Sequence, residues 1–414
     1  MSGIVLSASV RQNLLSLQST ASLLATTQNA LATGNKVNSA LDNPTNFFTA
    51  TGLNNRASDI GNLLDSIGNG VQVLQAANTG LTSLQSLVDT AKSIANQVLQ
   101  APTGFTTKAS ATSLAPTGAG PLAVAGTAAD LTNAGTNSLN GKTFVFTPAT
   151  GAATTITISS TVAAGNVNSI DSFNAALSSA GVGLSASLAS DGSITLTSTN
   201  DNASQTLTTG TTAAANTIAI SGTDTATLVT PTGGSAGKPV ADAGSQATRS
   251  SLVSQFNNII TQITTTAQDS SFNGINLLFG DNLKLTFDET GKSTLNITGV
   301  TFDAGGLGLS SLTSGTDFLD NSSANAQLTK LSAASTQLRT EASALGSNLS
   351  VVQLRQDFNK SLINVLQTGA SNLTLADPNE EAANSQALST RQSIATSALA
   401  LANQSQQSVL QLLR

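Results

Sequence analysis

Apolar residues near the N-terminus recur at the alternating three- and four-residue spacing of helices that pack against one another. This spacing joins Val10, Leu14, Leu17, Ala21, Leu24 and Leu31, with Gln28 as an interruption. Residues 1–41 are therefore expected to form one amphipathic helix, which Gly34 can end because glycine readily closes a helix C-terminus. Asn43 and Pro44 then supply an N-cap and a first-turn proline for a second helix.

The second helix is expected from Pro44 to about Leu99, a length of ~85 Å at 1.5 Å per residue. Its seam shifts phase once and comprises Ile60, Leu64, Ile67, Val71, Leu74, Leu81, Leu84, Val88, Ala91, Ala95 and Val98. Glycines within it, at positions 61, 68, 70 and 80, each cost about 1 kcal/mol relative to alanine. Partner helices must therefore stabilise it.

Residues 101–244 differ sharply in composition from the helical ends. They contain only nine charged residues, with no Arg and no Glu, and Ser, Thr, Ala and Gly dominate. Strand patterns nevertheless occur at 143–147, 154–158 and 194–197, and a short helix fits 170–180. A small β-rich inserted domain is expected here.

Helical spacing returns from Gln246, at Leu252, Phe256, Ile259 and Ile263. A β-hairpin is expected next, with alternating apolar residues on either side of a turn at 288–292. The helix after Asn321 has the clearest seam: Leu328, Leu331, Leu338, Ala342, Leu345, Leu349, Val352, Ile363 and Leu366, with Ser335, Gln356 and Asn359 in the remaining positions.

A final helix is expected to begin at Asp377, Pro378 and Glu380, which provide an N-cap, a first-turn proline and a capping-box acid. Its apolar stripe contains Ile394, Ala398, Leu401, Val409 and Leu412. Breakers at 34–44 and 369–378 separate the two end helices from the middle, so these helices are expected to pair with each other. Two helices of ~35 residues bury little surface and are marginal alone. Contacts with further copies of the chain would order these two helices, which indicates a polymer subunit. A self-contained helical bundle with a β insert fits the same periodicity.

The amino-acid composition limits the kinds of catalytic and metal-binding site that the chain can form. The chain has 414 residues, a formal net charge of −6, and no His, Cys, Trp or Tyr. A histidine base, a thiolate nucleophile and a Cys/His zinc site are thus excluded, and mild acidity disfavours a nucleic-acid surface. We expect no enzyme activity and no cofactor. No apolar run of ~20 residues predicts membrane insertion, and the N-terminal apolar residues are too dispersed for a cleavable signal peptide.

Several motifs resemble bacterial flagellins. Residues 32–43, ATGNKVNSALDN, are similar to the flagellin segment after the N-terminal helix, and Asn55-Arg56 also matches. Phe272-Asn273-Gly274 resembles the motif before the flagellin hairpin, and residues 406–414, QQSVLQLLR, resemble the flagellin C-terminus. The resemblance covers 1–100 and 245–414. In enteric-type flagellins the variable part follows the hairpin, whereas here it precedes the hairpin.

The resemblance implies a filament subunit that is mainly α-helical with a β-rich insert. It divides the chain into a core helix at 1–43, a shell helix at 44–100, an outer insert at 101–244, a shell helix, hairpin and long helix at 245–370, and a core helix at 371–414. The core-assembly residues would be Val10, Leu14, Leu17, Leu24, Leu31, Ile394, Leu401, Val409 and Leu412.

The same resemblance implies an extracellular location in the flagellum, reached without a cleavable signal. The expected partners are further flagellin copies, hook–filament junction and filament cap proteins, the export apparatus and an export chaperone. A hook–filament junction protein and a surface adhesin are the alternatives; a metallopeptidase insert, known in some flagellins, would need histidines.

One segment of the second helix bears on recognition by the vertebrate toll-like receptor that senses flagellin. Thr90, Lys92, Ser93 and Ile94 lie where stimulatory flagellins have Arg at the position of Thr90 and Glu at that of Ser93. Lys92 and Ile94 keep a charge and an apolar contact, but Thr90 lacks a bidentate guanidinium. Weak receptor binding is therefore expected. Neutral sequence change on a helix face that is buried in the filament would also explain a threonine at position 90.

Overall fold

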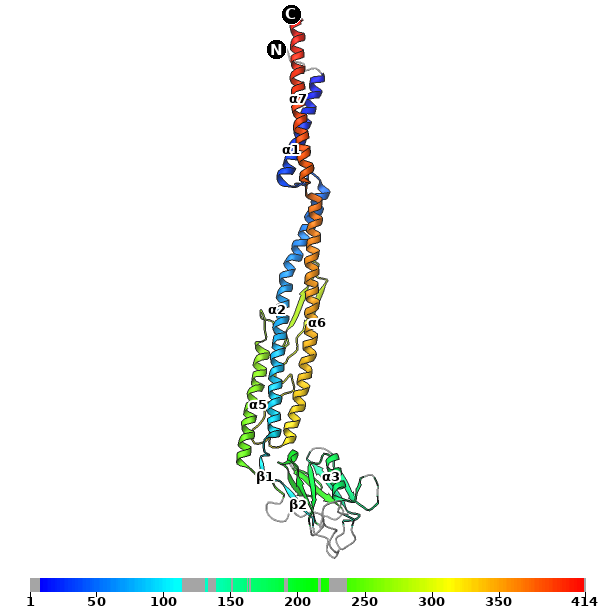
Figure 1. Cartoon of the computed structure of the whole chain (residues 1–414), viewed down its shortest axis with the longest axis vertical. Coiled ribbons are helices and arrows are strands. Elements are labelled where there is room, and N and C mark those ends of the chain that lie inside the picture. Colours follow the sequence, from blue (N-terminus) through cyan, green and yellow to red (C-terminus); the bar gives the residue numbers. More distant parts are fainter. Residues whose placement is uncertain are drawn as a thin grey trace. The chain divides into compact units, whose positions relative to one another are not determined.

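The computed structural model describes residues 8–113, 131–132, 139–149, 152–161, 163, 165–189, 193–214, 217–222 and 237–412. Along the sequence, long helices precede and follow a β-rich middle segment (Figure 1). The helices are α1 (Ala8–Thr33), α2 (Pro44–Gln100), α3 (Ile170–Ser179), α5 (Ala243–Asp269), α6 (Asn321–Thr374) and α7 (Pro378–Leu412). The chain forms two compact units, one of Met1–Gln72, Leu283–Ile297 and Ser347–Arg414, the other of Val73–Asn282 and Thr298–Gly346. The expected mainly helical fold with a β-rich insert is thus confirmed.

Helix ends agree closely with their sequence signals. Gly34 adopts a positive φ of 72° directly after α1, so the helix stops at Thr33 and the expected continuation to residue 41 is wrong. The Asn43 side chain accepts a hydrogen bond from the backbone N–H of Asn46 at 3.0 Å and caps α2. Asp377 caps α7 in the same way, accepting from the N–H groups of residues 379 and 380.

In the first unit, the N-terminal part of α2 packs along the C-terminal part of α6. Ala57, Ile60 and Leu366 form a small buried cluster at this contact. Gly369 was expected to break the helix, but α6 continues through it to Thr374. A Cβ at Gly369 would lie 3.6 Å from Leu53 Cδ1, so the glycine brings α2 and α6 close together instead.

The predicted hairpin, β11 (Asn282–Thr286) and β12 (Thr294–Thr298), is confirmed and is held against both long helices of this unit. Leu285 fills the space beside Gly70, where a Cβ would come within 2.3 Å of its side chain. The buried amide of Asn359 donates to the Phe287 carbonyl oxygen at 3.0 Å. A polar position in the α6 seam is therefore explained by a main-chain partner on the hairpin.

In the second unit, α2, α5 and α6 bury their predicted seams. The buried seam residues include Leu74, Leu81, Leu84, Val88, Leu252, Phe256, Ile263, Leu331 and Leu338. Ser335, another polar seam position, shares two hydrogen bonds with the amide of Gln85 across α2 and α6. A Cβ at Gly80 would lie 2.2 Å from Ser270 Oγ, so this glycine permits a close helix contact.

The Phe272-Asn273-Gly274 motif forms a tight turn. Asn273 and Gly274 have φ values of 51° and 79°, the left-handed conformation that asparagine and glycine tolerate best. Asn276, just after the turn, is buried and donates to the carbonyl oxygens of Ala267 and Gln268, both at 2.8 Å. These are C-terminal carbonyls of α5 without helical partners, so the motif caps that helix.

In the described part of the β-rich insert, a five-stranded sheet, a three-stranded sheet and α3 share one hydrophobic core. The strands are β2 (Ser110–Thr112), β3 (Thr143–Pro148), β4 (Thr154–Ile158), β5 (Asn166–Val167), β6 (Leu184–Leu188), β7 (Ile194–Ser198), β8 (Thr206–Thr209) and β9 (Thr217–Gly222). They form sheets of order β5-β4-β3-β9-β8 and β2-β7-β6. Phe144, Phe146 and Phe173 are fully buried with ring centroids 5.3–6.2 Å apart.

The predictions for β3, β4, β7 and α3 are confirmed. The remaining strands were not predicted; in β6, for example, the segment LSASL is composed largely of Ala and Ser. Such short side chains give little contrast between buried and exposed positions.

The two ends of the insert meet in a short antiparallel pair, β1 (Phe105–Thr107) with β10 (Val240–Ala241). The Asp242 N–H donates to the Gly104 carbonyl oxygen at 2.9 Å. The insert lies between α2 and α5, ahead of the hairpin, in the order expected from the sequence.

Arg249 anchors this junction. Only 1% of its surface is exposed, and it donates to the carbonyl oxygens of Val98, Ala101, Pro102 and Phe318 at 2.7–3.2 Å. The first three carbonyls lie at the end of α2 and lack helical partners. Phe318 has a positive φ of 58°, a conformation rare for a bulky residue. Burial lowers the pKa of Arg249, and the nearby charge of Asp320 opposes this shift.

Candidate assembly surface

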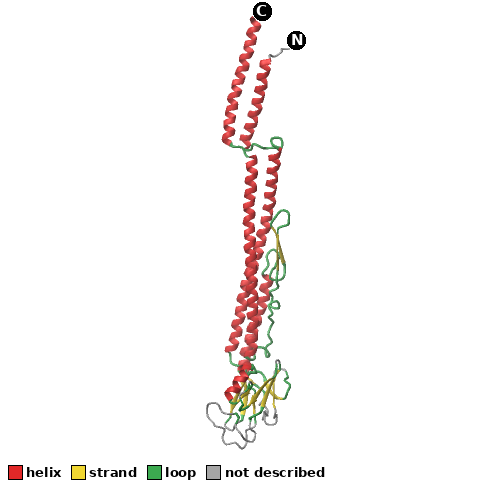
Figure 2. Cartoon of the chain, turned by 90° about the vertical axis from the view of Figure 1, so that its right-hand side faces the viewer, coloured by secondary structure: helices red, strands yellow, loops and turns green. Residues whose placement is uncertain are grey.

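The helices from the two ends of the chain, α1 and α7, lie side by side (Figures 1 and 2). Their connectors are joined by main-chain hydrogen bonds, from the Lys36 N–H to the Thr374 carbonyl oxygen at 2.8 Å and from the Ala376 N–H to the Gly34 carbonyl oxygen at 3.0 Å. The expected pairing of the end helices is therefore confirmed within one chain.

One side of α1 is covered by this pairing. Its covered positions follow heptad spacing and are Val10, Asn13, Leu17, Thr20, Leu24 and Thr27. Among the predicted assembly residues, Val10 is buried and Leu17 and Leu24 are half-buried, whereas Leu14 and Leu31 remain exposed. The contact with α7 thus uses part of the predicted stripe and several polar residues.

The pairing uses a different face of α7 from the predicted one. The half-covered positions are Glu381, Ser385, Leu388, Gln392, Ala395, Leu399 and Ala402, again at heptad spacing. The predicted stripe lies beside them and is open: Ile394 is 64% exposed and Leu401 69%. The side chains of Val409 and Leu412 lie outside the described part of the structure.

The two end helices therefore leave several large apolar side chains exposed in a single chain, namely Leu14, Leu15, Leu23, Leu31, Ile394 and Leu401. Full burial of one such side chain contributes about 1.5–3 kcal/mol. The covered seam, by contrast, contains Thr20, Thr27 and Gln392, which contribute little apolar area. The end helices consequently have more apolar surface available to neighbours than a contact between themselves can use.

The connector after α1 is a hydrogen-bonded turn. The Asp42 carboxylate accepts from the N–H groups of Asn38 and Ser39 at 3.0 and 2.8 Å and from the Ser39 hydroxyl at 3.1 Å. These bonds lower the pKa of Asp42, the Asn38 backbone bond most strongly. The turn leaves the Leu41 side chain 96% exposed.

The segment expected to bear on receptor recognition lies on α2 in the second unit. Thr90 and Ser93 are exposed, Lys92 is partly exposed, and Thr90 donates to the Ser86 carbonyl oxygen at 2.8 Å. Lys92 lies 3.8 Å from Asp89 on the same helix. Ile94 is buried, so in this conformation it does not offer the apolar contact expected of it.

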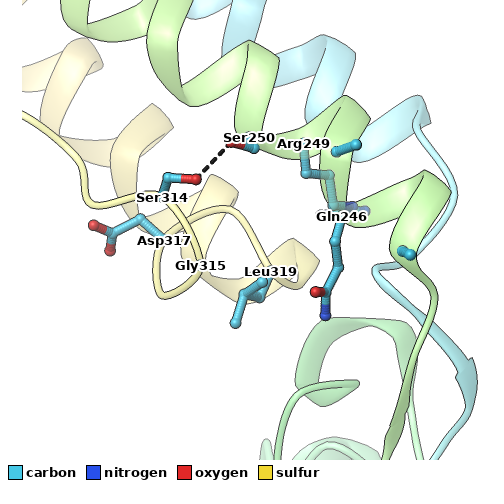
Figure 3. Close-up of a pocket in the computed structure, with 9 residues that line it drawn as sticks. Gln246, Arg249, Ser250, Ser314, Gly315, Asp317 and Leu319 are labelled. Carbon is cyan, nitrogen blue, oxygen red and sulfur yellow. Dashed lines mark hydrogen bonds between the residues drawn. The ribbon is translucent and has the colours of Figure 1, made fainter.

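A shallow pocket at the start of α5 has no features of a reactive site (Figure 3). Gln246, Arg249, Ser250, Ser314 and Asp317 line it, and the Ser250 and Ser314 hydroxyls are 2.6 Å apart. The Arg249 guanidinium is already hydrogen-bonded to main-chain oxygens. The pocket is therefore best explained as the margin of the junction that holds the insert.

Among the described residues, no cluster of three or more acidic side chains could hold a metal ion. Within the same residues, no helix combines the length and apolar character needed to cross a bilayer.

Comparison with known proteins gives two matches that flank the insert. Residues 5–116 match the bacterial flagellin N-terminal helical region, and residues 328–413 match the bacterial flagellin C-terminal helical region. Flagellin FljM of Caulobacter vibrioides is 33% identical over 172 residues, which are 41% of this chain and 61% of that protein. Flagellin FljO of the same organism is 31% identical over 174 residues, 41% of this chain and 62% of that protein.

A second organism gives a shorter match. Flagellin A of Rhizobium meliloti is 37% identical over 90 residues, 22% of this chain and 23% of that protein. The aligned region thus spans about three fifths of the Caulobacter relatives. Both terminal helical regions of bacterial flagellins are thus matched in this chain in their proper order, one on each side of the insert.

Proposed function

We propose that this chain is a structural subunit that polymerises, through its terminal helices, into an extracellular flagellar filament for motility. The observation that supports this most directly is the uncovered apolar stripe on α7, where Ile394 and Leu401 stay 64 and 69% exposed although α1 and α7 pack together. The matches to both terminal helical regions of bacterial flagellins support the same conclusion.

The terminal helices suit assembly because they have two usable faces. The covered positions of α1 and α7 hold the pair together, and the positions outside this contact include exposed leucine and isoleucine. An apolar surface of this kind is typical of a protein interaction site. Repetition of the contact between many copies would bury it and stabilise helices that are marginal in a single chain.

We further propose that the protein has no catalytic role, and that its other partners are the junction and cap proteins at the filament ends and the export apparatus with its chaperone. The relatives named above are flagellins, which favours the filament subunit over a hook–filament junction protein or an adhesin.

Assembly of the purified full-length chain tests the proposal. The chain is seeded with short sheared filaments of itself, and growth is followed by sedimentation and electron microscopy. Elongated filaments that contain the chain are the expected result. A chain that stays monomeric under these conditions, and is absent from filaments sheared from cells that express it, would contradict the proposed function.

A further inference from the structure

Helix α6 carries two heptad seams in the first unit, and only one of them is used within the chain. The buried seam contains Val352, Leu366 and Ala370. The second seam follows the same spacing along the outer side of the helix: Ser347, Val351, Leu354, Phe358, Ser361, Val365 and Thr368. Its four large apolar side chains, at positions 351, 354, 358 and 365, are 43, 71, 56 and 66% exposed. We name these seven residues the α6 outer seam.

The outer side of α2 in the same unit has matching spacing but the opposite character. Its exposed heptad positions are Phe48, Gly52, Asn55, Asp59, Asn62, Ser66 and Asn69, which we name the α2 outer seam. Apart from Phe48, all of these side chains are small or polar. A Cβ at Gly52 or at neighbouring Gly61 would meet no atom within 4 Å, so contacts within the chain do not explain these helix-weakening glycines. Gly70, in contrast, is filled by Leu285.

We propose that the α6 outer seam of one copy packs against the α2 outer seam of the next copy in the filament; this inference rests on the proposed function. Within one chain α2 and α6 run antiparallel, because Leu53 lies near Gly369 and Gly68 lies near Gln356. Copies that point the same way would therefore bring α6 of one antiparallel to α2 of the other.

One antiparallel register aligns six of the seven positions of each seam and leaves Ser347 and Phe48 without a counterpart. Because their three- and four-residue steps mirror each other, Leu354 faces Ser66, Phe358 faces Asn62, Val365 faces Asn55 and Thr368 faces Gly52. Bulky apolar side chains then meet short ones, the arrangement in which knobs enter holes between helices. The polar position Ser361 is set opposite Asp59.

One further observation favours a second copy with this orientation. A contact between two different faces is heterologous and continues into an open polymer, whereas two α6 outer seams packed on each other would close a dimer.

Disulfide trapping tests the register, because the chain contains no cysteine. A variant with Leu354→Cys and Ser66→Cys is polymerised under reducing conditions, oxidised, and resolved on a denaturing gel. The mismatched control combines Leu354→Cys with Asn55→Cys, which is 11 residues from Ser66, or about 16 Å along the helix. The third sample contains Leu354→Cys alone.

A covalent ladder from the matched pair, with little from the mismatched pair or the single variant, is expected. If filaments form but the matched pair cross-links no better than the mismatched pair, the proposed contact is wrong. Dimers from Leu354→Cys alone would indicate a closed contact between α6 outer seams and would also overturn it. If the double variant does not polymerise, an equimolar mixture of the Leu354→Cys and Ser66→Cys single variants should give covalent dimers. Absence of these dimers would also show that the proposed contact is wrong. Failure of the unsubstituted chain to polymerise would instead contradict the proposed function.

A second measurement avoids cysteine. Val365→Asp should raise the critical concentration for polymerisation about tenfold or more. Asn364→Asp, on another exposed side of α6, should change it little. Equal effects of the two variants would refute the assignment of Val365 to a contact between copies.

Discussion

Replacement of Leu401 by aspartate is the most direct perturbation of the proposed assembly surface. Leu401 is 69% exposed in the single chain, so the unassembled subunit should tolerate the change within about 0.5 kcal/mol. If assembly buries the exposed part, the leucine contributes about 1–2 kcal/mol per subunit, from about 1.5–3 kcal/mol for complete burial. The aspartate loses this contribution and adds the cost of an unpaired carboxylate in an apolar contact. Together these effects should cost at least about 3 kcal/mol, or about 100-fold in affinity.

The assay is the critical concentration for seeded polymerisation, measured by sedimentation and checked by electron microscopy. It should rise about 100-fold for Leu401→Asp. Thr396→Asp is the matched control, because Thr396 is also exposed on α7 but lies away from the stripe of Ile394 and Leu401. Circular dichroism of both variants verifies that the subunit remains folded. Filaments of normal length at the unsubstituted chain's critical concentration would refute the reasoning, as would equal losses from the two variants.

Four further predictions concern the rest of the chain. Arg249→Met should destabilise the unit that contains the insert by about 3–5 kcal/mol in urea unfolding, because main-chain oxygens of Val98, Ala101 and Phe318 lose their donor; a cost below about 1 kcal/mol would contradict this role. Gly80→Ala should destabilise the same unit by about 1–3 kcal/mol through its clash with Ser270, whereas Gly61→Ala, which meets open space, should stabilise α2 by up to about 1 kcal/mol. Replacement of residues 105–241 by a short linker should leave export and filament formation intact, because the residues that flank the excision, Gly104 and Asp242, are already joined by a main-chain hydrogen bond; normal export without filaments in electron microscopy would show that the insert contributes to the lattice. In a reporter-cell assay for the flagellin-sensing toll-like receptor, the purified subunit should be a weak ligand, and Thr90→Arg with Ser93→Glu should strengthen the response by a factor of about 30 if the arginine adds about 2 kcal/mol; a response of the unsubstituted chain equal to that of an enteric-type flagellin would refute this.

The sequence by itself determined the long helices and their ends. Heptad spacing and local signals at Asn43, Asp377 and Gly34 are properties of a few adjacent residues, and α2 begins, α7 begins and α1 ends where these signals lie. The seam of α6 could also be predicted from the sequence, because large apolar residues recur along it with few interruptions. The strands rich in alanine and serine were not, since their burial depends on the aromatic cluster around Phe144 and Phe173 rather than on their own pattern.

Only the tertiary structure decided which face of each helix is covered. The sequence placed Ile394 and Leu401 on an apolar stripe of α7, but α1 packs on the neighbouring stripe around Leu388 and Leu399, and the predicted one stays open. Heptad spacing identifies a face that can pack without naming its partner, because any second seam with the same spacing satisfies it. The roles of Arg249 and Asn359 were likewise invisible in the sequence, since each binds main-chain oxygens of residues far away along the chain. Backbone carbonyls are present at every residue, so only folding determines which of them lack a partner and require a buried donor.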